Sequence, residues 1–315
     1  MIKKLDVLCI GHILVDIRFL VDNLPGPDEE AGILDERRGV GGSAANVAIA
    51  VKRLGLNSGV IGKIGFDNFG RIAVDDLLRE KIDISGLKIS LTTTTGFSVV
   101  VRDSRGRIVI YGFKGAAEEL LPNDLSVDLV SKTKYLHIAS LRLDTTIKAI
   151  ELAREYNVKV SWDPGRRLSV LGYRKLEKII NSINILFANE KEIQNITGIR
   201  DYREASKYLI DKGPEIIIVK RGDKGVYVLT SEKEYIQPAC PVETIVDTTG
   251  AGDSFAAGFL SGLIRRFTLE DTIKYASIVA ALKVSRLGSH NTPTHNEVLK
   301  YGEKNTVCKL TYPKP

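Results

Sequence analysis

Residues 247–266 read DTTGAGDSFAAGFLSGLIRR and pass from a turn of small residues into an apolar stretch with helical spacing. Phe255, Phe259 and Leu263 recur every four residues, so they share one face of a helix. Small residues before a helix let successive backbone N–H groups face an anion, and the helix dipole adds positive potential there. The stretch therefore predicts an anion-binding turn at the start of a helix.

Asp253 is the last residue of this turn. A carboxylate beside an anion-binding turn would repel a phosphate unless it had a chemical role. The obvious role is to accept the proton of a substrate hydroxyl during phosphoryl transfer. The alternative is that Asp253 only caps the helix, and the turn alone leaves both interpretations open.

Around this turn, apolar strand-like segments alternate with helix-like stretches, which predicts an α/β fold with a doubly wound, largely parallel sheet between helices. The expected strands are residues 5–11, 60–65, 134–139, 158–163, 183–189 and 215–220. The segments of about 12–40 and 92–113 break the alternation, and the second resembles a β-hairpin around SRGR, residues 104–107. We expect residues 1–315 to form a single domain in which these two segments form a small β-sheet lid.

The composition excludes several classes of protein. The net charge is +6, yet basic residues are interspersed with 39 acidic ones, so a nucleic-acid partner is not expected. The first apolar run is interrupted by Asp6 and His12, which argues against a signal peptide or a membrane span. Cys9, Cys240 and Cys308 lie far apart without metal-ligand spacing, so we expect free thiols in a reducing cytoplasm.

Two other segments carry candidate ligand-binding residues. In GVGGSAANVA, residues 39–48, Gly41 and Gly42 permit close approach of a ligand, and Asn46 offers a donor and an acceptor one turn into the helix. Asp16 follows the first expected strand, at the edge where open α/β sheets bind ligands. Taken singly, a tight turn, an exposed amide and a solvated loop acid explain these residues equally well.

Four motifs together resemble one family, the ribokinase-like, or PfkB, carbohydrate kinases. They are GHILVDIRF (11–19), GGSAANVAIAVKRLG (41–55), ANEKE (188–192) and DTTGAGDSFAAGF (247–259). The resemblance extends from about residue 5 to about residue 300. It implies a ribokinase-like fold and the ATP-dependent transfer of the γ-phosphoryl group to a primary hydroxyl of a sugar.

The resemblance also implies roles for individual residues. For catalysis it indicates Asp253 as the base and the amides of Gly250, Ala251 and Gly252 as an anion hole. For substrate binding it indicates Asp16, Gly41, Gly42 and Asn46. For ATP it indicates Asn189, Lys220, Gly222, Gly225, Gly250 and Gly252, and for Mg²⁺ it indicates Glu192 acting through water. Asp247 and Thr249, with backbone near Gly288, correspond to the ligands of a monovalent cation such as K⁺.

The acceptor stays open at this level. Ser43 and, approximately, Ser140 stand where ribokinase itself typically has a Lys and an acidic residue, which weakens ribose specificity. A ribokinase- or fructokinase-like sugar kinase is therefore weighed against a nucleoside kinase acting on adenosine, guanosine or cytidine. No role is assigned to four arginines, namely Arg102, Arg107, Arg166 and Arg167.

Two rivals outside the kinases are weaker. A sugar-sensing protein without catalysis would normally lack the base or the GAG turn, and both are present here. An NAD-dependent dehydrogenase would carry GxGxxG after the first strand, where this chain has GHILVD. For assembly, the exposed strand edges of a small lid sheet lead us to expect a homodimer that forms through the lid.

Overall fold

Nine strands form one large sheet in the computed structural model, which describes residues 4–311. The strand order is β13-β12-β11-β10-β9-β8-β1-β4-β5, and every neighbouring pair is parallel except β11–β12 and β12–β13. The bounds are β1 (Leu5–Gly11), β4 (Ser58–Gly65), β5 (Asp83–Ser90), β8 (Thr133–Ala139), β9 (Lys159–Asp163), β10 (Ile185–Asn189), β11 (Ile216–Lys220), β12 (Val226–Thr230) and β13 (Glu234–Gln237). The predicted α/β class with a largely parallel sheet is confirmed.

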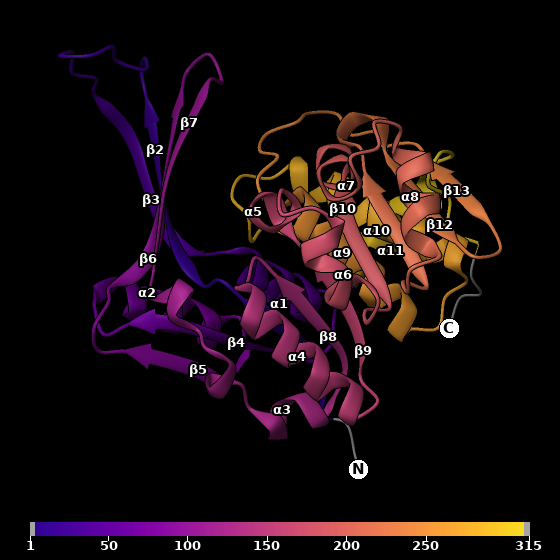
Figure 1. Ribbon diagram of the computed structural model, residues 1–315. Coiled ribbons are helices and arrows are strands. Elements are labelled where there is room, and N and C mark those ends of the chain that lie inside the picture. Colours follow the sequence, from indigo (N-terminus) through magenta and orange to yellow (C-terminus); the bar gives the residue numbers. More distant parts are fainter. Residues whose placement is uncertain (1–3, 312–315) are drawn as a thin grey trace.

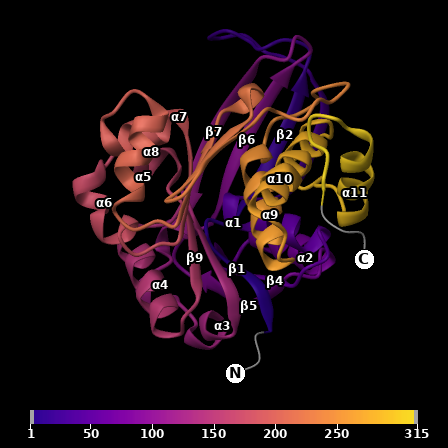
Figure 2. The same ribbon diagram turned by 90° about the vertical axis from the view of Figure 1, so that its right-hand side faces the viewer.

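Helices cover both faces of this sheet, as Figure 2 shows. One face carries α1 (Ser43–Arg53), α2 (Asn68–Arg79), α9 (Ala251–Ile264), α10 (Leu269–Val284) and α11 (His295–Lys304). The other carries α3 (Val127–Ser131), α4 (Leu143–Glu155), α5 (Gly165–Ser169), α6 (Tyr173–Ile180), α7 (Glu190–Thr197) and α8 (Tyr202–Ile210). Short 3₁₀ turns span Ala116–Glu119, Pro122–Asp124 and Gly222–Lys224. No described helix is long and apolar enough to cross a bilayer.

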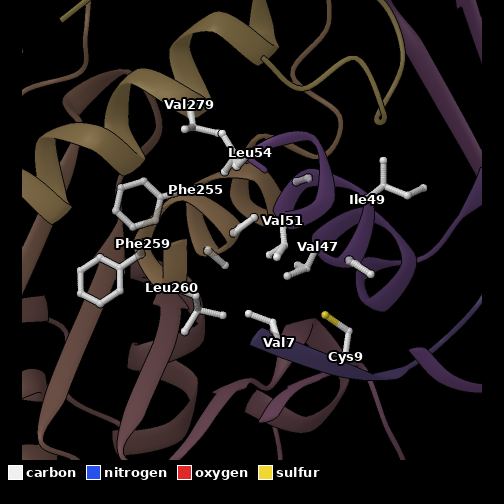
Figure 3. Packing of buried hydrophobic residues seen from close by; sticks show 14 of the residues in the cluster. Val7, Cys9, Val47, Ile49, Val51, Leu54, Phe255, Phe259, Leu260 and Val279 are labelled. Carbon is white, nitrogen blue, oxygen red and sulfur yellow. The ribbon is translucent and has the colours of Figure 1, made fainter. Parts of the chain in front are cut away.

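Strand β1 explains why the central strands are apolar along their whole length. Successive side chains of a strand point to opposite faces, and here both faces are covered. Val7 and Cys9 pack in the core beneath α1 and α9, whereas Leu8 and Ile10 pack in the core on the opposite face. Figure 3 shows the first of these cores, where side chains of α1 and α9 meet above β1. This packing fixes the positions of the two glycine-rich helix starts.

A separate four-stranded sheet projects from the main body (Figure 1). Its order is β3-β2-β6-β7, with bounds β2 (Leu14–Val21), β3 (Ile33–Gly41), β6 (Thr95–Asp103) and β7 (Ile108–Gly115). Strands β6 and β7 are the antiparallel hairpin that the sequence predicts around SRGR. The pairing of β2 with β6 is parallel, and it joins the two segments that break the α/β alternation.

The prediction that all three cysteines are free thiols is wrong. Cys240 and Cys308 form a disulfide whose partners are 68 residues apart in sequence, while Cys9 is buried in the core as a thiol. Sequence spacing gave no indication of the pairing because the bond joins the loop after β13 to the segment after α11. These two segments meet only in the folded chain.

We expect the disulfide to stabilise the fold by restricting the unfolded chain. Closing a loop of 68 residues contributes about 2–4 kcal/mol to the free energy of unfolding. The double variant Cys240→Ala/Cys308→Ala should show a free energy of unfolding that is lower by this amount in denaturant unfolding. A reductant should lower the stability of the native chain but not that of the double variant. Equal stability of the native chain with and without reductant would contradict this prediction.

Candidate active site

The turn before α9 has the form that an anion-binding helix start requires. Gly250 precedes the helix in the left-handed conformation, with φ of 76°, and an added Cβ would lie 3.2 Å from Ser289. A side chain at Gly250 would therefore be both strained and crowded. Gly250 is the N-cap residue of α9 and makes no side-chain capping bond, whereas Asp253 lies in the first turn of the helix. Asp253 is therefore not the N-cap residue.

The Asp253 carboxylate instead contacts α1. Asn46 Nδ2 donates to Asp253 Oδ2 at 2.7 Å, and the Ser43 hydroxyl also bonds this carboxylate. Ser43 is the first residue of α1 and Asn46 follows three positions later, so their side chains lie on the same face of the helix. Both side chains face the start of α9. Two glycine-rich helix starts thus meet around one carboxylate.

His290 holds the Asn46 amide in this orientation. Its Nε2 lies 3.0 Å from Asn46 Oδ1. Burial lowers the pKa of His290 to about 3, and nearby arginine and lysine charges act in the same direction. The ring is therefore neutral, and its N–H donates to Asn46 so that the Asn46 NH₂ group points to Asp253.

The pKa of Asp253 suits a general base. Burial raises the pKa of Asp253 to about 6, and the charge of Asp163 adds to that rise. The hydrogen bonds from Asn46 and Ser43 and the charge of Lys220 act against it. A carboxylate with this pKa is mostly ionised at pH 7 and yet is more basic than an ordinary aspartate.

Asp16 lies on β2 with its carboxylate held from two sides. Ser98 Oγ donates to Oδ1 at 2.6 Å, and Arg18 donates to Oδ2 at 2.9 Å. An added Cβ at Gly41 would lie 2.4 Å from Asp16 Oδ1, so only glycine leaves room for this carboxylate. Gly42, the next residue, is the N-cap position of α1. Asp16 is thereby placed at the junction between the small sheet and α1.

Lys220 ends β11 beside the α9 turn. Its Nζ donates to Asp163 Oδ2 at 2.6 Å, and it would lie 3.3 Å from a Cβ added at Gly252. Asp163, at the end of β9, was not predicted as a site residue. Gly222 and Gly225 flank the short turn that follows Lys220 and leads into β12. The Lys220 ammonium is thus poised next to the predicted anion hole rather than exposed to solvent.

Asn189 and Glu192 form a reciprocal capping box at the start of α7. The Glu192 amide donates to Asn189 Oδ1, and the Asn189 amide donates to Glu192 Oε2. Burial raises the pKa of Glu192, and the charge of Asp163 adds to the rise while Lys220 opposes it. No cluster of three or more acidic, His or Cys residues suitable for a metal occurs within residues 4–311. The role of Glu192 in holding Mg²⁺ through water stays a prediction.

Asp247 is bonded by backbone rather than open to a cation. Its carboxylate accepts hydrogen bonds from the amides of Thr249 and Gly288, both at 2.9 Å. Burial alone would raise the pKa of Asp247, but these bonds and the charge of Lys283 hold the pKa below its usual value.

Lys283 Nζ donates to the Asp247 backbone carbonyl at 2.7 Å. Burial lowers the pKa of Lys283 to about 8, which leaves it charged at pH 7. Asp247, which is expected to bind a monovalent cation, therefore already contacts the charged Lys283 ammonium through its backbone carbonyl. This arrangement fits K⁺ poorly.

A cavity of about 770 Å³ opens between the small sheet and the α9 turn. Arg18 and Arg102 contribute from the small sheet, and Thr249, Gly288 and His290 contribute from the main body. Arg102 donates to the Val246 carbonyl at 3.0 Å.

The other arginines without an assigned role differ from Arg102. Arg107 pairs with Asp103 in the same hairpin at 2.7 Å, and Arg167 pairs with Glu118. Arg166 lines a second, smaller cavity near Ser140.

Three of the predicted residues connect to Asp253 or to the turn before α9. Asn46 touches Asp253, Lys220 lies against Gly252, and Asp16 is joined through Arg18 and Ser289 to the loop beside Gly250. The residues that sequence reasoning missed are Arg18, Ser98, Asp163, Lys283 and His290. Asp163 stands in WDPGRR, residues 162–167, at the end of an expected strand. The others act through contacts between distant segments, which a single sequence does not reveal.

Known proteins are similar to this chain in sequence and in architecture. The family model described as pfkB family carbohydrate kinase matches residues 4–296. An ATP-dependent ribose-1-phosphate kinase of Halopiger xanaduensis is 34% identical over 94% of this chain and 97% of its own length. The crystal structure of the Methanocaldococcus jannaschii nucleoside kinase, which is 30% identical, superposes with a TM-score of 0.83 over 97% of this chain and 100% of that chain. An Arabidopsis thaliana ribokinase structure with ribose and ATP, 24% identical, has a TM-score of 0.85 over 96% and 99% of the two chains, which supports the fold.

We expect kcat/KM to depend on ionised Asp253. Since the base acts only when deprotonated, kcat/KM should fall below a pH of about 6 and level off above it. Asp253→Asn should lower kcat by at least about 100-fold while leaving substrate affinity largely intact. Asp211→Asn, a change at an exposed carboxylate at the end of α8, is the control. A near-normal kcat in Asp253→Asn would show that Asp253 is not the base.

Proposed function

Because the chain belongs to the pfkB family of carbohydrate kinases, we propose that its acceptor is a sugar that already carries a phosphate, with ribose 1-phosphate as the first candidate. The carrying observation is Arg102, whose guanidinium lines the cavity and has no carboxylate partner among the described residues. Arginine binds phosphate by paired N–H donors and is suited to such a role. The relative from Halopiger xanaduensis supports the same acceptor.

In this mechanism Asp16 binds sugar hydroxyls and Asp253 accepts the proton of the primary hydroxyl as it attacks the γ-phosphorus of ATP. Asn46 orients the Asp253 carboxylate. The amides of Gly250, Ala251 and Gly252 and the ammonium of Lys220 stabilise the charge of the transferring group. When bound, Mg²⁺ supplies further neutralisation of the phosphates, and Glu192 would hold it through water.

The small sheet acts as a lid in this proposal. It carries Asp16 and Arg102, while the base lies in the main body. Closing the sheet over the acceptor would bring these groups together and exclude water, which prevents the wasteful hydrolysis of ATP. The hydrogen bond from Arg18 to Ser289 is a contact of the lid with the loop beside the α9 turn.

A nucleoside is the second candidate acceptor. The same cavity has an apolar lining in addition to its arginines, formed by Phe19, Leu20, Val100, Ile108, Ile245 and Leu287. Such a lining suits a planar base. The nucleoside kinase of Methanocaldococcus jannaschii, similar over nearly the whole chain, supports this alternative.

A coupled assay of ADP release distinguishes the acceptors. Ribose 1-phosphate should give a higher kcat/KM than ribose, fructose, fructose 6-phosphate, adenosine, guanosine or cytidine with Mg-ATP, and EDTA should stop turnover. Arg102→Ala should raise KM for ribose 1-phosphate by about 10–100-fold, because it removes charge-assisted hydrogen bonds, with little effect on ribose. Arg107→Ala, in the same hairpin, should change neither. A preference for a nucleoside that Arg102→Ala leaves intact would favour the alternative.

We also propose that two copies associate through the lid sheet. Its outer strands β3 and β7 expose large apolar side chains, namely Ile33, Leu34, Ile108, Ile110, Tyr111 and Phe113. Ile110 and Tyr111 are 62% and 65% exposed, which is a high exposure for side chains of this kind. An unpaired strand edge with apolar side chains favours pairing with a second copy.

Light scattering tests this assembly directly. The chain should have the mass of two copies of 34.6 kDa, and Ile110→Lys/Tyr111→Lys should shift it to one copy without unfolding it. Ile236→Lys, a change at an exposed apolar residue on β13, is the control and should keep the dimer. A monodisperse monomer of the unmodified chain would refute the proposal.

A further inference from the structure

Lys283 is a buried cation next to the anion-binding turn. It lies one residue before the end of α10 and is 0% exposed. Its Nζ donates to the Asp247 carbonyl at 2.7 Å. A buried ammonium is strongly disfavoured unless it is paired, so a lysine here needs a compensating interaction. The backbone and carboxylate of Asp247 provide that interaction.

The end of α10 holds Asp247 beside this ammonium. The amides of Val246 and Asp247 both donate to the Val284 carbonyl, at 2.8 and 3.1 Å. The C-terminal end of a helix carries partial negative charge, which favours a cation at that place. The Lys283 ammonium is therefore fixed by three features at once: the helix end, the Asp247 carbonyl and the Asp247 carboxylate nearby.

A second fixed cation lies on the other side of the same loop. Arg18 donates to Ser289 Oγ at 2.8 Å, and one of its nitrogens would lie 3.0 Å from a Cβ added at Gly288. The Asp247 carboxylate accepts from Gly288 and Thr249 and so has fewer free positions for a metal ion. A mobile monovalent cation at this loop would be repelled by Lys283 and Arg18 together.

We propose that the Lys283 ammonium takes the place of a monovalent cation behind the anion hole, so that this kinase does not depend on K⁺. The ammonium supports positive potential at the turn of Gly250, Ala251 and Gly252 from the side opposite the reacting phosphate. It is covalently tethered, so its occupancy does not vary with the salt in the solution. The proposal rests on the kinase activity of the family and not on the identity of the acceptor.

Turnover and stability should both be measured in K⁺ and in tetramethylammonium at equal ionic strength. The native chain should show the same kcat within about twofold, and the same melting temperature, in both salts. Lys283→Met should lose at least about tenfold in kcat in tetramethylammonium and regain part of it with K⁺ or NH₄⁺, because a mobile ion can then enter. Lys274→Met, on the same helix and paired with Glu270, should behave as the native chain.

The melting temperature needs no acceptor, so it tests the proposal even if ribose 1-phosphate is the wrong substrate. Activation of the native chain by K⁺ of severalfold over tetramethylammonium, or stabilisation by K⁺ alone, would overturn the proposal. Unchanged kcat in Lys283→Met would also overturn it. If Lys283→Met does not fold, the comparison of salts on the native chain still decides.

Discussion

The hydrogen bond from Asn46 to Asp253 is the contact on which the proposed site depends. It joins the first turns of α1 and α9, which come from opposite ends of the chain and pack on the same face of the sheet. The apolar residues of α1 and α9 hold these helices in register above β1. Glycines at both helix starts remove the Cβ atoms that would obstruct the approach, as Gly41 does for Asp16. The packing of α1 and α9 above β1 therefore sets both the hydrophobic core and the geometry of the site.

Charge is distributed around this contact so that each group has a partner. Asp253 and Glu192 have raised pKa values because both are buried and both are near Asp163. Lys220 balances these carboxylates and lies at the edge of the anion-binding turn. On the far side of the turn Lys283 balances Asp247. The turn thus has the partly buried Lys220 and the buried Lys283 near it, and such positive charges favour the transfer of a highly charged phosphoryl group.

The sequence predicted the parts of the fold that depend on local pattern. Six apolar runs became parallel strands, and SRGR became a hairpin turn, because burial on both faces and tight turns leave clear compositional signals. The edge strands β13 and β5 were not assigned, since β13 has only four residues and β5 is only partly buried. Strand β12, between β13 and β11, was also not assigned, although it is buried. The Cys240–Cys308 disulfide and the contact of His290 with Asn46 join segments 68 and 244 residues apart, and a single sequence carries no signal for either. Asp253 was predicted as a site residue from the sequence, but its contact with Asn46 required the structure.

The ionisation of Asp253 can be observed directly by carbon-13 NMR of its carboxyl group across a pH titration. We predict a pKa of about 6 in the native chain. In Asn46→Ala the pKa should rise further, because the hydrogen bond that stabilises the charged form is lost. A pKa near the ordinary 3.8 in the native chain, with no change in Asn46→Ala, would contradict the central claim that α1 and α9 together create a tuned base.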